Sequence, residues 1–177
     1  MVCSVYPRTG GLEETMEKEI RIRLKSERYE VDASLFSSAE EDTDGLFCLD
    51  EDDLQKPEVM EIQSVGTMRI SDGRVEIVYD ETEATGMAGS RTVISFLEGE
   101  AGIVSMVREG TVSTSLVFES AKRYRCVYQT PYMPFEICVH TRKVENRLLA
   151  DGILNLDYVI EIRGAKAERT KFFMQIL

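Results

Sequence analysis

Hydrophobic and polar residues alternate along most of the chain with the two-residue period of β-strands. In the first such run, Ile20, Ile22 and Leu24 alternate with Arg21 and Arg23. One apolar and one polar face predict a half-buried strand over residues 19–29. Further alternating runs predict strands over residues 59–70, 74–83, 91–97, 103–108, 111–118, 122–129, 135–142, 153–163 and 169–176. A helical turn is compatible with residues 143–150, and the remaining pattern is that of an all-β protein.

Short turns separate these strands. Residues 71–73 (Ser-Asp-Gly), 98–100 (Glu-Gly-Glu), 108–110 (Arg-Glu-Gly) and 130–132 (Thr-Pro-Tyr) each join two β-rich runs. Short strands at regular spacing with tight turns favour an antiparallel meander over βαβ units. We therefore predict a single antiparallel β-barrel of about eight to ten strands, because barrel closure removes exposed strand edges.

The charge of the chain is unevenly distributed. The net charge is −11, and residues 30–61 hold 12 acidic residues and one basic residue, so the rest of the chain is balanced. A segment of single-sign charge between two strands predicts a solvated loop. We expect residues 1–16 to be a flexible leader and residues 17–177 to form one β-barrel domain with an acidic, flexible insertion at about residues 32–57. Met16 is either the native start or the first ordered residue.

Composition narrows the classes of function. No apolar stretch approaches the length of a transmembrane helix, and residues 1–18 lack the apolar core of a secretory signal. We therefore expect a cytoplasmic protein that does not bind a membrane, and the acidic balance disfavours nucleic acid. The cysteines show no metal-binding spacing and His140 is the only histidine, so neither a metal nor a cofactor is predicted. We expect His140 to be a partly exposed sheet residue.

The strand predicted over residues 122–129 has a basic and an aromatic face. Arg123 and Arg125 share one side, while Tyr124 and Tyr128 share the other. Such mixtures can bind RNA, but the alternation favours a half-buried strand with a solvated face. Cys126 lies on this strand and Cys138 on the next. Reduced thiols are expected at both positions, as in cytosolic proteins.

Five short motifs follow one another along the chain. They are Tyr79-Asp80-Glu81-Thr82-Glu83-Ala84-Thr85-Gly86, Arg108-Glu109-Gly110, Phe118-Glu119, Tyr128-Gln129-Thr130-Pro131-Tyr132 and Leu154-Asn155-Leu156-Asp157-Tyr158. Their order and spacing resemble those of the YwiB-like family of small bacterial proteins. The resemblance runs from about Glu17 to the C-terminus and implies a calycin-like, lipocalin-like barrel with meander topology. It implies no activity, cofactor or catalytic residue. The chain contains no tryptophan, so it lacks the Gly-x-Trp signature of the classic lipocalins.

The strand predicted over residues 74–83 begins apolar and ends acidic. Val75, Ile77 and Tyr79 share one face, and the alternation places Glu81 and Glu83 on the same face. A face of this kind leads from a core to solvent or into a polar cavity, as at the mouth of a β-barrel. Arg108 ends a later strand at a hairpin and is expected at the same mouth. The predicted ligand-binding residues are Tyr79, Glu81, Glu83, Arg108, Tyr128 and Tyr132.

Three functions follow from this arrangement. We favour a non-enzymatic binding module whose barrel mouth takes a small polar or amphipathic ligand. The alternative is a protein-interaction module that contacts a cytosolic partner through the barrel edge or the acidic segment. An enzyme that uses the Glu/Arg cluster ranks third, because no nucleophile–base pair is evident and no catalytic residue is assigned. An ion pair between Arg108 and a glutamate that only seals the barrel is the structural alternative, and a homo-oligomer stays open.

Overall fold

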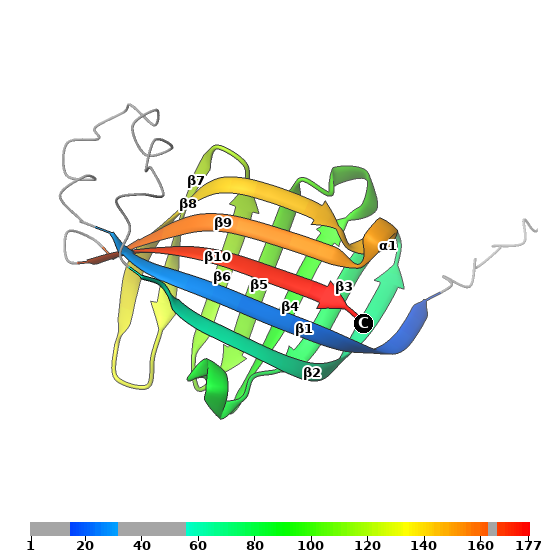
Figure 1. Ribbon diagram of the computed structural model, residues 1–177, viewed down its shortest axis with the longest axis horizontal. Coiled ribbons are helices and arrows are strands. Elements are labelled where there is room, and N and C mark those ends of the chain that lie inside the picture. Colours follow the sequence, from blue (N-terminus) through cyan, green and yellow to red (C-terminus); the bar gives the residue numbers. More distant parts are fainter. Residues whose placement is uncertain (1–14, 32–55, 163–165) are drawn as a thin grey trace, which may run out of the picture.

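A computed structural model of the chain describes residues 15–31, 56–162 and 166–177 (Figure 1). These ranges contain ten strands and three short helical turns. The strands are β1 (Met16–Val31), β2 (Glu58–Ser71), β3 (Arg74–Asp80), β4 (Ser90–Leu97), β5 (Ile103–Gly110), β6 (Ser113–Glu119), β7 (Lys122–Gln129), β8 (Pro134–Arg147), β9 (Ile153–Ile162) and β10 (Lys166–Ile176). The helical turns are η4 (Glu83–Thr85), η5 (Glu98–Glu100) and α1 (Leu148–Asp151).

The strands form a closed antiparallel barrel (Figure 1). Each strand pairs with its neighbour in sequence, and β1 pairs with both β2 and β10, which closes the sheet. Ile22, for example, lies opposite Ser64 on β2 and Ile176 on β10. This arrangement confirms the predicted all-β barrel with meander topology, and each predicted strand is present.

Three sequence expectations need correction or fall outside the described ranges. The third strand ends at Asp80 and not at residue 83. Strand β8 continues to Arg147, so the helical turn expected over residues 143–150 is limited to α1. The predicted leader, apart from its last residues, and most of the predicted acidic insertion lie outside the described residues.

The inward faces of the strands form the hydrophobic core in one part of the barrel. Ile22, Ile77 and Met174 are fully buried there, together with Ile94 and Leu154. Further along the same strands the inward side chains become polar: Ser26 and Arg28 follow on β1, and Glu168 and Thr170 precede Met174 on β10. The same alternation that points apolar side chains into the core therefore also points polar side chains into one end of the barrel. Within the described residues, no helix has the length and apolar character needed to cross a membrane.

Candidate functional site

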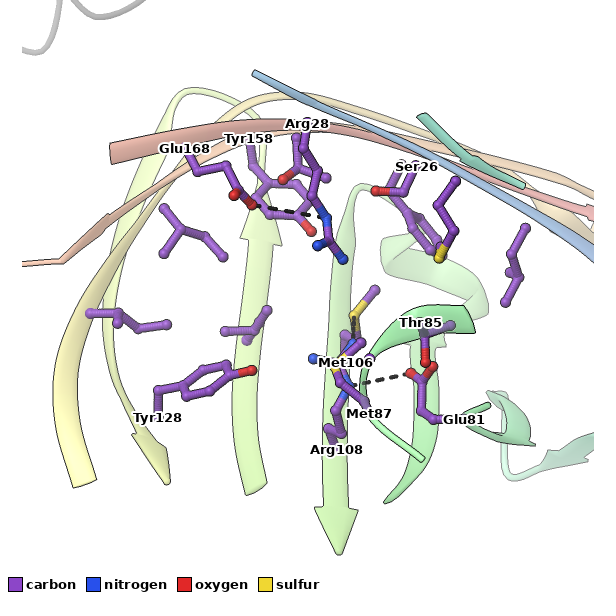
Figure 2. Close-up of a pocket in the computed structure, with 18 of the residues that line it drawn as sticks. Ser26, Arg28, Glu81, Thr85, Met87, Met106, Arg108, Tyr128, Tyr158 and Glu168 are labelled. Carbon is purple, nitrogen blue, oxygen red and sulfur yellow. Dashed lines mark hydrogen bonds and ion pairs between the residues drawn. The ribbon is translucent and has the colours of Figure 1, made fainter. Parts of the chain in front are cut away.

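A cavity of about 480 Å³ occupies the end of the barrel where β1, β3 and β5 end (Figure 2). Part of its wall is apolar and includes Leu24, Met106, Leu116, Phe135, Ile137 and Phe172. The polar lining groups include Arg28, Glu81, Arg108, Tyr128, Tyr158 and Glu168. The site therefore combines an apolar chamber with a small set of charged and hydroxyl groups.

Adjacent strands align the main polar residues in a row. Tyr79 on β3 lies opposite Thr92 on β4, and Thr92 lies opposite Arg108 on β5. Just beyond the end of β3, the backbone N–H of Glu81 donates to the carbonyl oxygen of Ser90 at 2.8 Å. This bond holds Glu81 beside β4, so its side chain reaches the same row.

Glu81 and Arg108 form an ion pair inside the cavity (Figure 2). Arg108 Nε lies 3.3 Å from Glu81 Oε1 and donates to Thr92 Oγ1 at 3.2 Å. The Thr92 hydroxyl in turn donates to Glu81 Oε1 at 2.5 Å. The side chain of Glu81 is 2% exposed and that of Arg108 is 11% exposed. Both charges are therefore held away from bulk water, where an ion pair is weakly screened.

The far end of the Arg108 guanidinium has a weak partner. Its Nη2 atom lies 3.7 Å from the Met106 sulfur, and a thioether is a poor hydrogen-bond acceptor. The two contacts of Arg108 described above share the single hydrogen on Nε. The Nη groups consequently have donor capacity for an additional acceptor in the cavity, such as a carboxylate or phosphate oxygen.

A second ion pair lines the cavity where β1 meets β10 (Figure 2). Arg28 Nε lies 4.0 Å from Glu168 Oε1, and both side chains are about one-third exposed. The sequence pattern does not reveal this pair, because only the β1–β10 pairing that closes the barrel brings the two residues together. The Arg108–Glu81 and Arg28–Glu168 pairs each join one positive and one negative side chain, so their charges sum to zero.

Two buried tyrosines add neutral hydroxyl groups to the lining. Burial raises the pKa of Tyr79 well above its usual value, and the nearby Glu81 carboxylate raises this pKa further. Burial also raises the pKa of Tyr158. Both phenols therefore stay protonated at neutral pH and can serve as hydrogen-bond donors.

Four of the six predicted ligand-binding residues line this cavity, namely Tyr79, Glu81, Arg108 and Tyr128. Tyr128 also stacks on Phe135, with ring centroids 5.2 Å apart. Glu83 does not continue the strand face as expected, because β3 has already ended and Glu83 begins η4. It lines an adjoining, smaller cavity of about 210 Å³, which shares Arg28 and Met60 with the main cavity. Tyr132 lies in the turn between β7 and β8, is 95% exposed and does not line the main cavity.

The turn after β3 covers part of the cavity. Thr85, Gly86 and Met87 line it, and Thr85 donates its hydroxyl proton to the carbonyl oxygen of Thr82 at 2.7 Å. Gly86 adopts a left-handed conformation with φ 73°, which glycine tolerates without a steric cost. The Thr-Gly of the acidic motif is therefore explained as the end of a short helical turn over the mouth.

His140 differs from its sequence expectation. It is 5% exposed and not partly exposed, and its Nε2 atom lies 3.0 Å from Glu161 Oε2. Burial lowers the pKa of His140, while the hydrogen bond to Glu161 opposes that shift.

Cys126 and Cys138 are both free thiols, as expected. Cys126 lies opposite Ile137 in the register, so the two sulfurs point to opposite faces of the sheet.

Comparisons with known proteins agree on the kind of domain. A family described as "Domain of unknown function (DUF1934)" matches residues 49–174. The crystal structure of the ywiB protein from Bacillus subtilis superposes with a TM-score of 0.57 at 15% sequence identity, covering 90% of this chain and 93% of that chain. At this identity the likeness shows a shared fold. No curated protein matches the sequence.

Proposed function

Because the chain belongs to the DUF1934 family, whose description gives no activity, we propose a function from the geometry of its cavity: the barrel binds a small amphipathic molecule. The observation that carries this proposal is the buried Arg108–Glu81 pair in a chamber that also has an extensive apolar wall. An apolar part of the ligand would pack between Leu116 and Phe172. Its polar head would lie against Arg108.

The size of the cavity supports a small-molecule ligand. Sites for such ligands usually enclose about 300–1,000 Å³ and combine apolar walls with a few well-placed polar groups. The cavity of about 480 Å³ falls in this range. A side-chain-filled barrel would leave no comparable space, so ligand binding would account for an interior that turns polar and hollow at this end.

The polar groups favour a head group that accepts hydrogen bonds. Arg108 is already oriented by Glu81 and Thr92 through its Nε, which leaves its Nη groups for a ligand. Tyr158 adds a protonated phenol nearby (Figure 2). A carboxylate or phosphate on the ligand would gain charge-assisted hydrogen bonds from the guanidinium. Preorganisation by the ion pair limits the conformational entropy that Arg108 loses on binding.

The first test is native mass spectrometry of gently purified protein together with displacement of a fluorescent anionic amphiphile, 8-anilinonaphthalene-1-sulfonate. We expect a non-covalent adduct or saturable dye binding that is lost in Leu116→Trp, which fills the chamber, and weakened in Arg108→Met. Arg125→Met is the matched control, because Arg125 lies on the outer face of β7 and is largely exposed. Dye binding that Leu116→Trp leaves unchanged in a folded protein would refute the proposal.

Two other functions stay predictions. Binding of a cytosolic protein through the acidic segment concerns residues that lie mostly outside the described ranges. An enzyme that uses the Glu81 carboxylate would need that group to exchange protons with a substrate while paired with Arg108. The ligand-binding proposal requires neither step, and we therefore place it first.

A further inference from the structure

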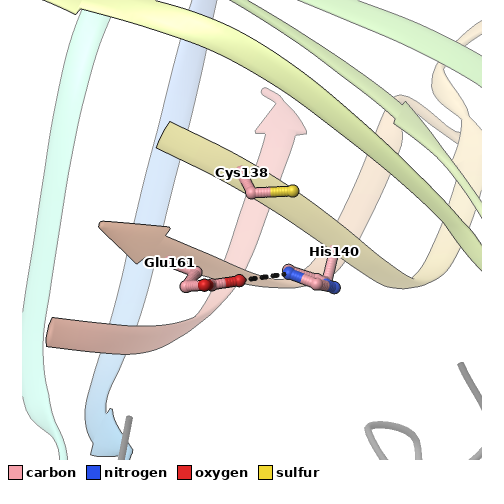
Figure 3. Close-up of side chains that lie close together, drawn as sticks. All are labelled: Cys138, His140 and Glu161. Atoms are coloured by element: carbon pink, nitrogen blue, oxygen red, sulfur yellow. Dashed lines mark hydrogen bonds and ion pairs between the residues drawn. The ribbon is translucent and has the colours of Figure 1, made fainter. Parts of the chain in front are cut away.

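The outer face of the barrel carries a compact group of three metal-ligating side chains (Figure 3). Cys138 and His140 are two residues apart on β8 and therefore point to the same side of the sheet. Glu161 on β9 lies directly opposite Cys138 in the register. Their sulfur, nitrogen and carboxylate oxygen atoms all lie within 4.8 Å of one another.

Two of the three side chains are buried, and the third is mostly shielded from solvent. Cys138 is 7% exposed and His140 is 5% exposed. His140 Nε2 is 3.0 Å from Glu161 Oε2. Because both strands belong to the hydrogen-bonded sheet, the backbone positions of the three residues are set by strand pairing and not by a loop.

We propose that Cys138, His140 and Glu161 bind a thiophilic divalent cation, with Zn²⁺ as the best match. One thiolate, one imidazole and one carboxylate are all ligand types that Zn²⁺ accepts, and three protein ligands leave a fourth position for water. Donor atoms around tetrahedral zinc lie roughly 3.3–3.8 Å apart, given bond lengths of about 2.0–2.3 Å. The His140 Nε2–Glu161 Oε2 distance of 3.0 Å must open slightly, while any separation near the 4.8 Å limit must shorten by about 1 Å. Side-chain rotation can supply both changes.

A cationic side chain already lies at this group. Arg123 on β7 donates from Nε to the Cys138 sulfur at 3.0 Å, and its Nη2 atom is 3.6 Å from Glu161 Oε2. The guanidinium therefore contacts two of the three proposed ligands. Its side chain is 36% exposed, so it can rotate into solvent when a metal ion enters. Metal binding then exchanges one cation for another, and the Cys138 thiol releases its proton.

The proposed site is separate from the ligand cavity. Ile137 and Val139 alternate with Cys138 and His140 on β8 and are buried in the core of the barrel. Ile137 lines the cavity. The metal site therefore uses the opposite face of the same strand, and variants of its ligands need not alter the amphiphile site.

Titration with Co²⁺ tests the proposal in the full-length chain. Cys3, Cys48 and Cys126 are changed to serine, so that Cys138 is the remaining thiol in the sequence. We expect a thiolate-to-cobalt charge-transfer band at one equivalent, displaced by Zn²⁺. Glu161→Gln and His140→Ala should each weaken binding at least about tenfold, because each removes one ligand.

Arg123→Gln should increase the affinity for Co²⁺, a change that a folding defect would not produce. Removing the competing guanidinium should tighten Co²⁺ binding about tenfold, because its charge-assisted bonds no longer have to be broken. Arg91→Gln is the matched control: it removes the same charge from a largely exposed arginine on β4, a strand that pairs with neither β8 nor β9, and should leave the affinity unchanged. The proposal is overturned if no band appears in either the three-serine protein or its Arg123→Gln version. It is equally overturned if Glu161→Gln and His140→Ala leave the affinity unchanged.

Discussion

Arg108 and Glu81 are 27 positions apart in the chain, yet Arg108 Nε lies 3.3 Å from Glu81 Oε1 inside the barrel. Thr92 joins them, since its hydroxyl donates to Glu81 and accepts from Arg108. The three residues come from the end of β3, from β4 and from β5. This set of hydrogen bonds therefore links three neighbouring segments at the mouth. Its loss should lower both the free energy of unfolding and the affinity for a ligand.

Removing the charge of Glu81 should be strongly destabilising. In Glu81→Leu the Arg108 guanidinium stays largely buried without its carboxylate, and breaking a buried pair in this way costs about 3–5 kcal/mol. Urea-induced unfolding measures the loss. Glu81→Leu combined with Arg108→Met should be more stable than Glu81→Leu alone, because no unpaired charge is then buried.

The neighbouring pair of Asp80 and Arg91 provides the control. Its atoms are 2.9 Å apart, but both side chains are mostly exposed, and exposed pairs contribute little to stability. Asp80→Asn should therefore unfold at nearly the same urea concentration as the wild type. If Asp80→Asn and Glu81→Leu lowered the free energy of unfolding equally, burial would not explain the contribution of the Glu81–Arg108 pair.

Alkaline pH should unfold the protein through its buried tyrosines. Burial raises the pKa values of Tyr79 and Tyr158 in the folded state, whereas in the unfolded chain these phenols ionise near pH 10. The unfolded state therefore loses protons first, and stability should fall progressively as the pH rises above about 10. Tyrosinate absorbance should show exposed tyrosines ionising first and the buried ones only on unfolding.

Tyr79→Phe tests the source of this effect. It removes one of the raised phenols, so the decline of stability above about pH 10 should be shallower. Tyr132→Phe is the control, since Tyr132 is almost fully exposed. A Tyr79→Phe protein with the same alkaline dependence as Tyr132→Phe would contradict the assignment.

The alternation of apolar and polar residues was sufficient to predict the strands, because each strand has one face in the core. The alternation of Val75, Ile77 and Tyr79 places all three inside, as expected. The alternation failed at Glu83, because the local helical turn of η4 ends the strand and breaks the period. Local patterns also could not place Arg28 beside Glu168, or Cys138 opposite Glu161, since both depend on which strands pair and in which register.

The two tyrosines of the Tyr-x-Thr-Pro-Tyr motif should have different effects when changed to alanine. Tyr128 lines the cavity and stacks on Phe135, so Tyr128→Ala should lower the free energy of unfolding by about 1–3 kcal/mol and weaken amphiphile binding. Tyr132 is almost fully exposed, so Tyr132→Ala should change neither. Urea unfolding and dye titration measure both quantities, and weakened binding in Tyr132→Ala alone would place the ligand outside the barrel.

Gly110 should be intolerant of any side chain. Its φ is 136°, and a Cβ atom there would lie 2.3 Å from the carbonyl oxygen of Gly89 and 2.6 Å from Ser90 Cα. Backbone atoms cannot move aside as a flexible side chain can, so Gly110→Ala must separate β5 from β4. Backbone strain alone costs about 1–3 kcal/mol, and the clash adds to it. Because Ser90 holds the backbone of Glu81, the same change should weaken amphiphile binding.

Gly99→Ala is the matched control for this prediction. Gly99 has no positive φ, and a Cβ atom there would meet nothing within 4 Å. Alanine at this position should leave stability unchanged or raise it slightly, because it restricts the unfolded chain. Urea unfolding of both variants, with dye binding measured under folded conditions, distinguishes the two positions. A Gly110→Ala protein as stable as Gly99→Ala would show that β4 and β5 do not approach as closely at this end as the geometry requires.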